Sequence, residues 1–502
     1  MKSLQPALRR SAFSHVDRIV PRIAAAFLTA IVLLYLGFVG IGNWAADEYD
    51  DFGRLARDGW TEVWLRLRWS PRPVSEPLFL LYGWTVNHLR RPLIVPFLGL
   101  LWCMFLAAGL FTCWQIRRTR NREIPPTETG ALELLVALAL MASFVSGGAT
   151  WEVFYWPAGT VAYLPTLAAT LLLFLQTASG SLASATGRRI CGACLLVAAG
   201  SSETGATFVL AYAVVQGLRR AAETMKPPER RSRGPVLWWL VPALVAILIV
   251  AALQSGRAHT PERPVNHGPA TGSRAADIAS AAKELPLEAL GISIRPHAAP
   301  TVNARFISEL LLSLGVALCW SRFRDTSRDA AWDVAALSAS FLIASFLTIA
   351  AAEIHFHAVC CQRHEIVRRC WILMGLAGIA IFTFGPRWTE RLRQGSISLL
   401  ASVLLCAGVI VAWHTRPALR EYRIYGAIYR ALDQNFRSGF NPDDDPMTFL
   451  LLPPGRLIYQ EQVAPGIYGR DQQPPLYLEY VLRFFDKQRI VVRSADEWMK
   501  HQ

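Results

Sequence analysis

Four acidic side chains occur within five positions of the stretch "NWAADEYDDFGRL", directly after a long apolar run. They are Asp47, Glu48, Asp50 and Asp51. A solvated helix start would explain them without chemistry, because the helix dipole stabilises carboxylates in the first turn. Two chemical interpretations compete with it. The acids could be oxygen ligands of a divalent cation, or one of them could be a general base whose pKa is raised by like charges and a low dielectric.

Further candidate residues lie between other apolar runs. Glu203 in "GSSETG" interrupts a charge-free stretch, and an ionisable residue at the membrane edge indicates either function or a satisfied structural acid. The stretch "WEVFYWPAGTVAY" contains Trp151, Tyr155 and Trp156. These aromatic residues suit an interfacial belt or a face on which a sugar stacks. Both stretches are therefore candidate substrate-binding segments.

The segment "EIHFHAVCCQRHEIVRR" combines histidines, adjacent cysteines and arginines, but its order matches no standard zinc spacing. Arg363 and Arg368 lie where an apolar helix is predicted to begin. Guanidinium groups suit bidentate phosphate binding, and ordinary interfacial anchoring is the alternative. If a divalent cation such as Mg²⁺ or Mn²⁺ is bound, its expected ligands are Asp47, Glu48 and His355.

The elements that must position these residues are membrane helices. Of the 502 residues, 53% are hydrophobic and only 18% are charged, whereas about 25% is usual in soluble domains. About 20 apolar residues cross a bilayer as a helix. Charge-free runs of about that length or longer cover 23–46, 92–116, 134–151, 153–187, 234–256, 334–352, 370–386 and 395–413.

The net charge of +14 describes topology rather than nucleic-acid binding. No basic stretch is interleaved with exposed aromatic residues, as single-strand binding requires, so no nucleic-acid partner is expected. Cytoplasmic loops carry excess Lys and Arg, and here basic residues crowd the short connectors 117–122, 187–189, 219–233, 322–328 and 387–393. This places the N-terminus in the cytoplasm and the C-terminus outside it.

The predicted fold is an all-α polytopic membrane protein with about eleven membrane segments and a small α/β extracytoplasmic C-terminal domain. The segment 190–218 has basic connectors on both sides, so we expect a hairpin of two short helices meeting at "GSSETG". The predicted divisions are a cytoplasmic N-terminus (1–22), a transmembrane domain (23–414) with external loops 44–91 and 255–302, and a C-terminal domain (415–502).

The first external loop is predicted to lie in the membrane interface. Trp60, Trp64 and Leu67 are spaced as one face of a helix, and "PLFLLYGWTVNHL" forms a second apolar segment. Trp and Tyr are enriched in interfaces, where arginines extend their charged ends to water. Acids give such anchoring little help, so this arrangement leaves the four acids unexplained.

Several short motifs together resemble the GT-C class of integral-membrane glycosyltransferases, nearest to bacterial O-antigen glucosyltransferase-like families. The motifs are "DEY" after the first helix, "WSPRPVSE" in the first loop, "GSSETG", "CQRHEIV", and the closing "YLEYVLRFFDKQRIVV". The chain departs from the family pattern in having Glu48 for a second Asp and Pro71 for a Gly.

The resemblance implies a polyprenyl-phosphate sugar donor and an envelope glycan, lipid or protein acceptor on the outer face of a bacterial inner membrane. Asp47 or Glu48 would be catalytic, and Arg363 or Arg72 would stabilise the leaving phosphate. The substrate-binding residues implied are Asp50, Asp51, Arg54, Arg72, Trp151, Tyr155, Trp156, Glu203, His355, Arg363 and Arg368. The alternatives are a transporter or flippase of lipid-linked glycan and a non-enzymatic envelope assembly factor.

Overall fold

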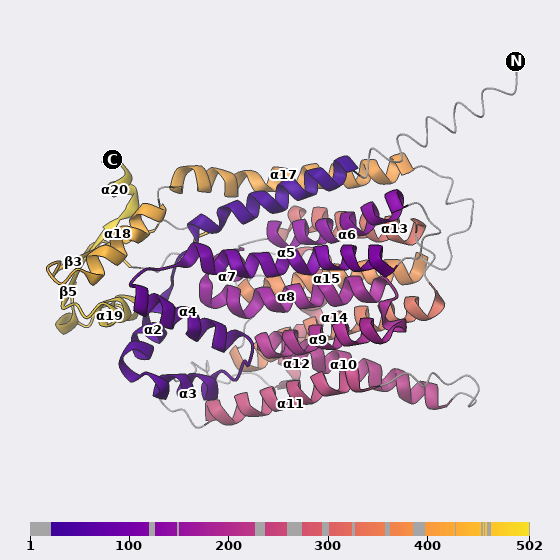
Figure 1. Ribbon diagram of the computed structural model, residues 1–502, viewed down its shortest axis with the longest axis horizontal. Coiled ribbons are helices and arrows are strands. Elements are labelled where there is room, and N and C mark those ends of the chain that lie inside the picture. Colours follow the sequence, from indigo (N-terminus) through magenta and orange to yellow (C-terminus); the bar gives the residue numbers. More distant parts are fainter. Residues whose placement is uncertain are drawn as a thin grey trace, which may run out of the picture.

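The computed structural model describes residues 22–119, 126–147, 150–225, 236–258, 274–293, 301–323, 327–356, 362–384, 397–426, 428–452, 455, 457–458 and 463–500. These residues form an elongated helical bundle with a small domain at one end (Figure 1). The chain enters by a helix over 22–37, which η1 (Phe38–Ile41) extends. The other bundle helices are α5 (Ile94–Thr119), α6 (Pro126–Ser146), α8 (Pro157–Ala178), α9 (Ala185–Ser201), α10 (Glu203–Thr224), α11 (Leu237–Ala258), α13 (Ala304–Phe323), α14 (Arg328–Phe356), α15 (Gln362–Phe384) and α17 (Ile397–Tyr425).

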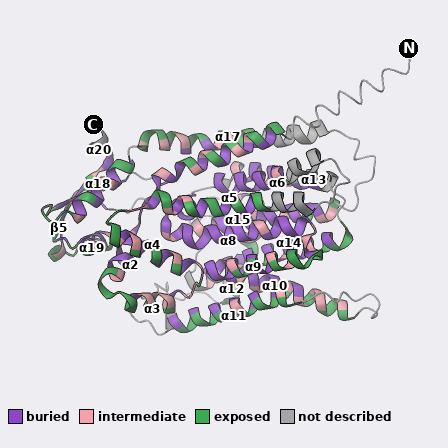
Figure 2. Cartoon of the chain, viewed as in Figure 1, coloured by how far each residue is buried: buried purple, intermediate pink, exposed green. Residues whose placement is uncertain are grey.

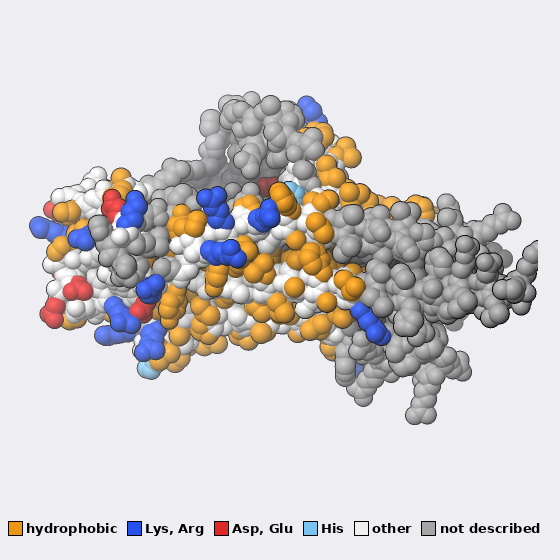
Figure 3. Space-filling model, turned by 90° about the horizontal axis from the view of Figure 1, so that it is seen from above, with side chains coloured by type: hydrophobic (Ala, Val, Ile, Leu, Met, Phe, Trp, Pro, Cys, Tyr) orange, Lys and Arg blue, Asp and Glu red, His pale blue; other side chains and the backbone are white. Residues whose placement is uncertain are grey.

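Six helices among the described residues are long and apolar enough to cross a membrane, which confirms a multi-pass membrane protein. Their spans are Arg22–Ile41, Ile94–Phe111, Pro157–Ala178, Leu237–Gly256, Arg328–Ile354 and Arg363–Phe384. The larger number of eleven stays a prediction. Hydrophobic side chains cover much of the bundle face in Figure 3, as expected of a surface in contact with lipid.

Burial separates the central helices from the outer ones. The α8 span is 89% buried inside the protein, whereas the spans of α5 and α11 are each 33% buried. Figure 2 shows the same contrast between α8 and α11. α8 therefore forms the centre of the bundle and is surrounded by other helices.

The segment 190–218 is two helices, α9 and α10, which meet at Ser202 within "GSSETG". The side chain of Ser202 caps α10 by accepting a hydrogen bond from the Gly205 backbone N–H at 3.0 Å. A Cβ at Gly205 would lie 1.9 Å from the Ala198 carbonyl oxygen, so only glycine allows this close turn. The turn places Glu203 at the first position of α10.

The segment 44–91, predicted to be the first external loop, folds into α2 (Ala46–Asp58), α3 (Trp60–Trp69) and α4 (Ser75–Leu89). Trp60 is 79% exposed and Trp64 is 71% exposed, which fits the predicted interfacial face. The second loop, predicted without elements, contains α12 (Arg274–Ala289) and a hairpin of β1 (Ile292–Ser293) and β2 (Thr301–Val302). The short α7 (Trp151–Phe154) and η2 (Ser181–Ala183) flank α8.

The C-terminal domain has the expected small sheet. Its strands are β3 (Met447–Leu451), β4 (Gly466–Gly469) and β5 (Arg489–Ser494), in the order β3-β5-β4 with β3 parallel and β4 antiparallel to β5. Helices α18 (Ile428–Phe440), α19 (Leu476–Phe484) and α20 (Ala495–Lys500), with η4 (Arg470–Gln472), complete it. Helix α17 ends at Tyr425 and α18 begins at Ile428, so two separate helices lead from the bundle into this domain.

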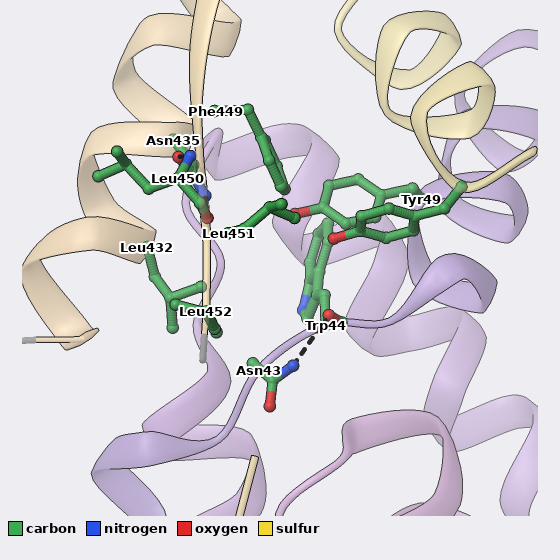
Figure 4. A pocket seen from close by; sticks show the side chains of 10 residues that line it. Asn43, Trp44, Tyr49, Leu432, Asn435, Phe449, Leu450, Leu451 and Leu452 are labelled. Atoms are coloured by element: carbon green, nitrogen blue, oxygen red, sulfur yellow. Dashed lines mark hydrogen bonds between the residues drawn. The ribbon is translucent and has the colours of Figure 1, made fainter. Parts of the chain in front are cut away.

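Aromatic packing fixes this domain against the first external loop. Trp44 lies 4.7 Å from Phe436 and 5.6 Å from Phe484 between ring centroids, and Tyr49 lies 5.7 Å from Phe484. A small cavity of about 20 Å³ lies between Trp44, Tyr49 and the strand β3 (Figure 4). The near absence of space there shows that the domain packs closely on the residues that precede and form α2.

Candidate active site

The two acids of "DEY" lie in the first turn of α2 but in different surroundings. Asp47 is exposed, whereas Glu48 is completely buried. Figure 1 places α2 and α4 at the same end of the bundle as α7. The neighbouring positions therefore present one carboxylate to the outside and one to the interior.

Glu48 is held by three N–H donors. Its Oε2 accepts hydrogen bonds from the Ala45 backbone N–H at 2.9 Å and from the Trp156 indole at 3.0 Å. Its Oε1 accepts one from the Ala158 backbone N–H at 2.9 Å. Burial raises the pKa of Glu48 to about 8, although the hydrogen bonds from Trp156, Ala158 and Ala45 favour the ionised form. Glu48 thus joins the start of α2 to the start of α8.

Asp47 is the accessible acid, and its charge reaches three ionisable neighbours. It interacts electrostatically with the adjacent Glu48, with Arg66 of α3 and with Arg363 of α15. Arg363 is far along the chain, and the charge of Asp47 acts on it because the bundle brings the start of α15 near the start of α2. An exposed carboxylate near a guanidinium can accept a proton from one part of a substrate while the cation binds an anion on another part.

Arg363 is positioned by residues that precede α8. Its backbone N–H donates to Glu152 Oε2 at 3.0 Å, and its Cζ lies 5.3 Å from the centroid of the Trp156 ring. Burial raises the pKa of Glu152, and the charge of Arg363 opposes that change. Trp156 therefore contacts both Arg363 and Glu48, and it connects the predicted acid motif to the predicted arginine motif.

A chain of ion pairs, which we call the mouth network, joins α2, α3, α4 and α10. Its pairs are Asp50–Arg54 (2.9 Å), Asp51–Arg66, Arg66–Glu76 (2.5 Å), Arg72–Glu76 (3.6 Å) and Arg72–Glu203 (2.7 Å). Burial works against the charge of Arg66, but Asp51 and Glu76 raise its pKa above the usual value. Through Arg66 and Glu76 the ion pairs connect the predicted residues Asp51, Arg72 and Glu203. Asp50 and Arg54 pair with each other on α2, and the charge of Asp51 also acts on Arg54.

Arg72 and Arg363 converge near Tyr163 of α8. Each interacts electrostatically with Tyr163, and the two guanidinium groups repel each other. The Tyr163 hydroxyl lies 3.0 Å from His364 Nε2. Within the described part of the chain, the Nε atoms of Arg72 and Arg363 are buried and have no hydrogen-bond partner. Two nearby cations with buried unpaired donors are a suitable site for an anion.

The predicted aromatic cluster is divided, and Tyr155 does not belong to the site. Trp151 and Trp156 pack at 5.8 Å between ring centroids beside the start of α2. Tyr155 is instead completely buried in the bundle, where its hydroxyl donates to the Tyr35 carbonyl at 2.8 Å and its ring lies 6.1 Å from Trp102. The short α7 ends at Phe154, so Tyr155 and Trp156 follow it outside the helix.

The arginines that follow Arg363 serve other contacts. Arg368 is 1% exposed and donates to both carboxylate oxygens of Glu288 on α12, at 3.2 and 3.3 Å. Two of its donors, Nε and Nη2, are thus occupied by α12, whereas Nη1 is buried without a hydrogen-bond partner among the described residues, so substrate binding by Arg368 stays a prediction. Arg369 pairs with Glu309 at 3.1 Å, and Arg305 pairs with the same carboxylate at 3.3 Å. We call Arg305, Glu309 and Arg369 the interior cluster.

The expected cation site of Asp47, Glu48 and His355 stays a prediction, because the His355 side chain lies outside the described residues. No three His, Cys, Asp or Glu residues in the described ranges lie together as metal ligands. Glu48 directs both carboxylate oxygens toward N–H donors, which leaves little for a cation to bind. His355 lies near the end of α14, and its side chain is outside the described residues. No step is therefore assigned to a metal.

Sequence reasoning missed three residues that connect the site: Arg66, Glu76 and Glu152. Glu76 is the last residue of the motif "WSPRPVSE". Its carboxylate accepts a hydrogen bond from the Ser70 hydroxyl at 2.7 Å and pairs with Arg66. Glu152 is the only acid in a long aromatic and apolar stretch, which was an available signal. Nothing in the sequence near Arg66 distinguishes it from the neighbouring interfacial arginines.

Comparison of the chain with protein-family models, with curated proteins and with solved structures found no match. The function must therefore be argued from the site.

Proposed function

We propose that this protein transfers a sugar from a polyprenyl-phosphate donor to an envelope glycan, lipid or protein acceptor, as a GT-C-like enzyme. The observation that carries the proposal is that the exposed carboxylate of Asp47 interacts electrostatically with the Arg363 guanidinium, while Trp156 contacts both Arg363 and the adjacent Glu48. One group suits a hydroxyl nucleophile and the other suits a phosphate leaving group.

In this mechanism Asp47 accepts the proton of an acceptor hydroxyl as its oxygen bonds to the anomeric carbon of the sugar. The bond from that carbon to the phosphate oxygen breaks, and polyprenyl phosphate leaves with the bonding electrons. Arg363 and Arg72 stabilise the phosphate through their buried, unpaired Nε–H donors. Glu48 is a positioning residue, because it holds Trp156 and the first turn of α8 in place.

The proposed enzyme lies in a bacterial inner membrane with its N-terminus in the cytoplasm and its C-terminal domain outside it. The basic connectors support this orientation. The exposed tryptophans of α3 support an interfacial position for the first loop. Eleven membrane segments, with α9 and α10 as a hairpin, form part of the same proposal.

The test is the release of polyprenyl phosphate by purified protein supplied with polyprenyl-phosphate sugars and candidate acceptors. Asp47→Asn is expected to lower the rate about a hundredfold or more, because general-base catalysis contributes about 10²–10⁴-fold. Asp58→Asn is the matched control, since Asp58 is exposed at the other end of the same helix. Full turnover by Asp47→Asn would remove the proposed catalytic role.

A transporter or flippase of lipid-linked glycan is the second candidate, and the interior cluster favours it. Glu309 is 1% exposed, inside the bundle and between two arginines, and buried ionisable groups in membrane proteins often mark transport paths. Flipping of a fluorescent lipid-linked sugar in proteoliposomes tests it. Flipping that Asp47→Asn leaves unchanged and that Glu309→Gln abolishes would favour transport over transfer.

A further inference from the structure

A groove of about 730 Å³ lies where the C-terminal domain meets the bundle, on a side of α2 that the proposed reaction does not use. One wall is the connector 90–93 between α4 and α5 together with the first residues of α5, and the other is α18. Tyr429, Phe436 and Phe440 line the second wall. This volume exceeds that of the small cavity beside Trp44 by far, and it is large enough to hold part of a lipid.

The polar part of the groove is basic. Arg90 and Arg91, both exposed, face it from the connector, and Arg437 faces it from α18. Asp433 is the one acidic residue among its described lining residues, and it pairs with Arg437 at 2.6 Å. In Figure 3, Lys and Arg side chains lie along the boundary between the C-terminal domain and the hydrophobic surface of the bundle. The charge of the groove therefore complements an anion.

The connector holds its arginines in a strained conformation. Arg90 and Leu93 have φ values of 50° and 45°, which non-glycine residues rarely adopt. The Tyr82 hydroxyl fixes the turn by donating to the Pro92 carbonyl at 2.5 Å. The Arg90 guanidinium lies 5.9 Å from the Phe440 ring centroid across the groove. A rigid turn that directs a cation toward the opposite wall indicates a built binding feature rather than a loose loop.

The groove also reaches the hydrocarbon edge. Its lining includes Ile94 and Val95, the first residues of a helix whose span is Ile94–Phe111. Val95 is 43% exposed. The basic part of the groove is thus continuous with the exposed apolar start of a candidate membrane span.

We propose that this groove binds an anionic phospholipid of the surrounding bilayer. The phosphate and headgroup lie among Arg90, Arg91 and Arg437, and an acyl chain follows the exposed surface of α5. The proposal is independent of glycosyl transfer, because none of these residues contacts the site at Asp47. A bound lipid would connect the membrane to the C-terminal domain through α18.

The experiment uses spin-labelled lipids with the full-length protein in nanodiscs, and it measures the motionally restricted fraction of each lipid. Phosphatidylglycerol is expected to be retained in preference to phosphatidylcholine. The triple variant R90Q/R91Q/R437Q is expected to lose that preference. Each arginine removed should lower the relative affinity for phosphatidylglycerol by roughly fivefold, because one basic residue near an anionic surface contributes about that factor. R437Q alone removes a side chain that is 81% exposed and should lose roughly fivefold without affecting folding.

The matched control is R416Q/R420Q/R423Q, which removes three exposed arginines from α17. These residues are equally basic and exposed but are absent from the described lining of the groove. Equal losses in the two triple variants would show general surface attraction and overturn the proposal, as would equal retention of the two lipids. Inorganic phosphate is the last arm. If it displaces phosphatidylglycerol at millimolar concentration, the groove is a site for free anions and not for lipid.

Discussion

The mouth network and the interior cluster are both built from arginines and carboxylates, but they differ in access. The mouth network lies beside the exposed Asp47, and Glu203 within it is 23% exposed. In the interior cluster Arg305 is 11%, Glu309 1% and Arg369 7% exposed. Charge pairing by itself therefore does not identify a reactive site. A reactive site also needs a group that a substrate can reach.

The largest effect is expected from opening the interior cluster. Glu309→Leu leaves Arg305 and Arg369 buried without their shared carboxylate, and removing one partner of a buried ion pair costs about 3–5 kcal/mol of unfolding free energy. Denaturation of the purified protein in detergent micelles measures it. The double variant Glu309→Leu/Arg369→Met should recover part of the loss. A single variant as stable as the wild type would show that the cluster is hydrated.

Glu48→Gln is expected to destabilise the protein by about 1–3 kcal/mol, the range for leaving buried polar groups unsatisfied. Both carboxyl oxygens of Glu48 accept hydrogen bonds, one from Ala45 and Trp156 and the other from Ala158. In glutamine the NH₂ group replaces one of these oxygens. It cannot accept, so it would face an N–H donor on that side. The same denaturation measurement tests it, with Asp47→Asn as the exposed control. Equal stability of the two variants would contradict the different surroundings of the two acids.

The pH dependence of the free energy of unfolding gives a second test of the buried Glu48. Folded Glu48 keeps its proton up to a pKa of about 8, whereas the ordinary value is 4.5. Between those values the folded state binds more protons than the unfolded state, so stability falls as pH rises and the contribution is lost above pH 8. Glu284, whose pKa burial raises to about 7, acts in an overlapping range. The measurement is therefore the difference between wild type and Glu48→Gln, and parallel pH profiles would refute it.

A smaller effect is expected in the mouth network. The Arg72–Glu203 pair is partly exposed, so a double-mutant cycle with Arg72→Gln and Glu203→Gln should give a coupling energy of about 1 kcal/mol. Under the proposed function, Arg72→Gln should also weaken donor binding, which a raised KM for the polyprenyl-phosphate sugar would show. A coupling energy for Arg72 and Glu203 larger than that for Arg369 and Glu309 would contradict the expected difference between the mouth network and the interior cluster.

The smallest effect belongs to a surface pair in the C-terminal domain. Arg483 and Glu479 pair on α19 with side chains 51% and 33% exposed. Glu479→Gln is expected to change the free energy of unfolding by less than about 0.5 kcal/mol. This variant sets the baseline for the others. A loss of several kcal/mol would mean that domain docking depends on this helix face.

The sequence by itself determined the local elements. Apolar runs predicted the six spans, tryptophan spacing predicted α3, and "GSSETG" predicted the break at Ser202. These features depend on hydropathy, residue period and capping, which act between near neighbours or against the bilayer.

Only the tertiary structure decided which candidate residues share a site. In the folded protein Asp47 is exposed and Glu48 is buried, and Arg363 interacts electrostatically with Asp47. Tyr155 packs in the bundle against Tyr35, apart from Trp156. The tertiary structure also pairs Arg368 with Glu288, and it pairs Arg66 with both Asp51 and Glu76. Adjacent residues in a sequence carry almost the same local signals. Their different environments come from helices that are far apart along the chain and pack together, and no local pattern records that packing.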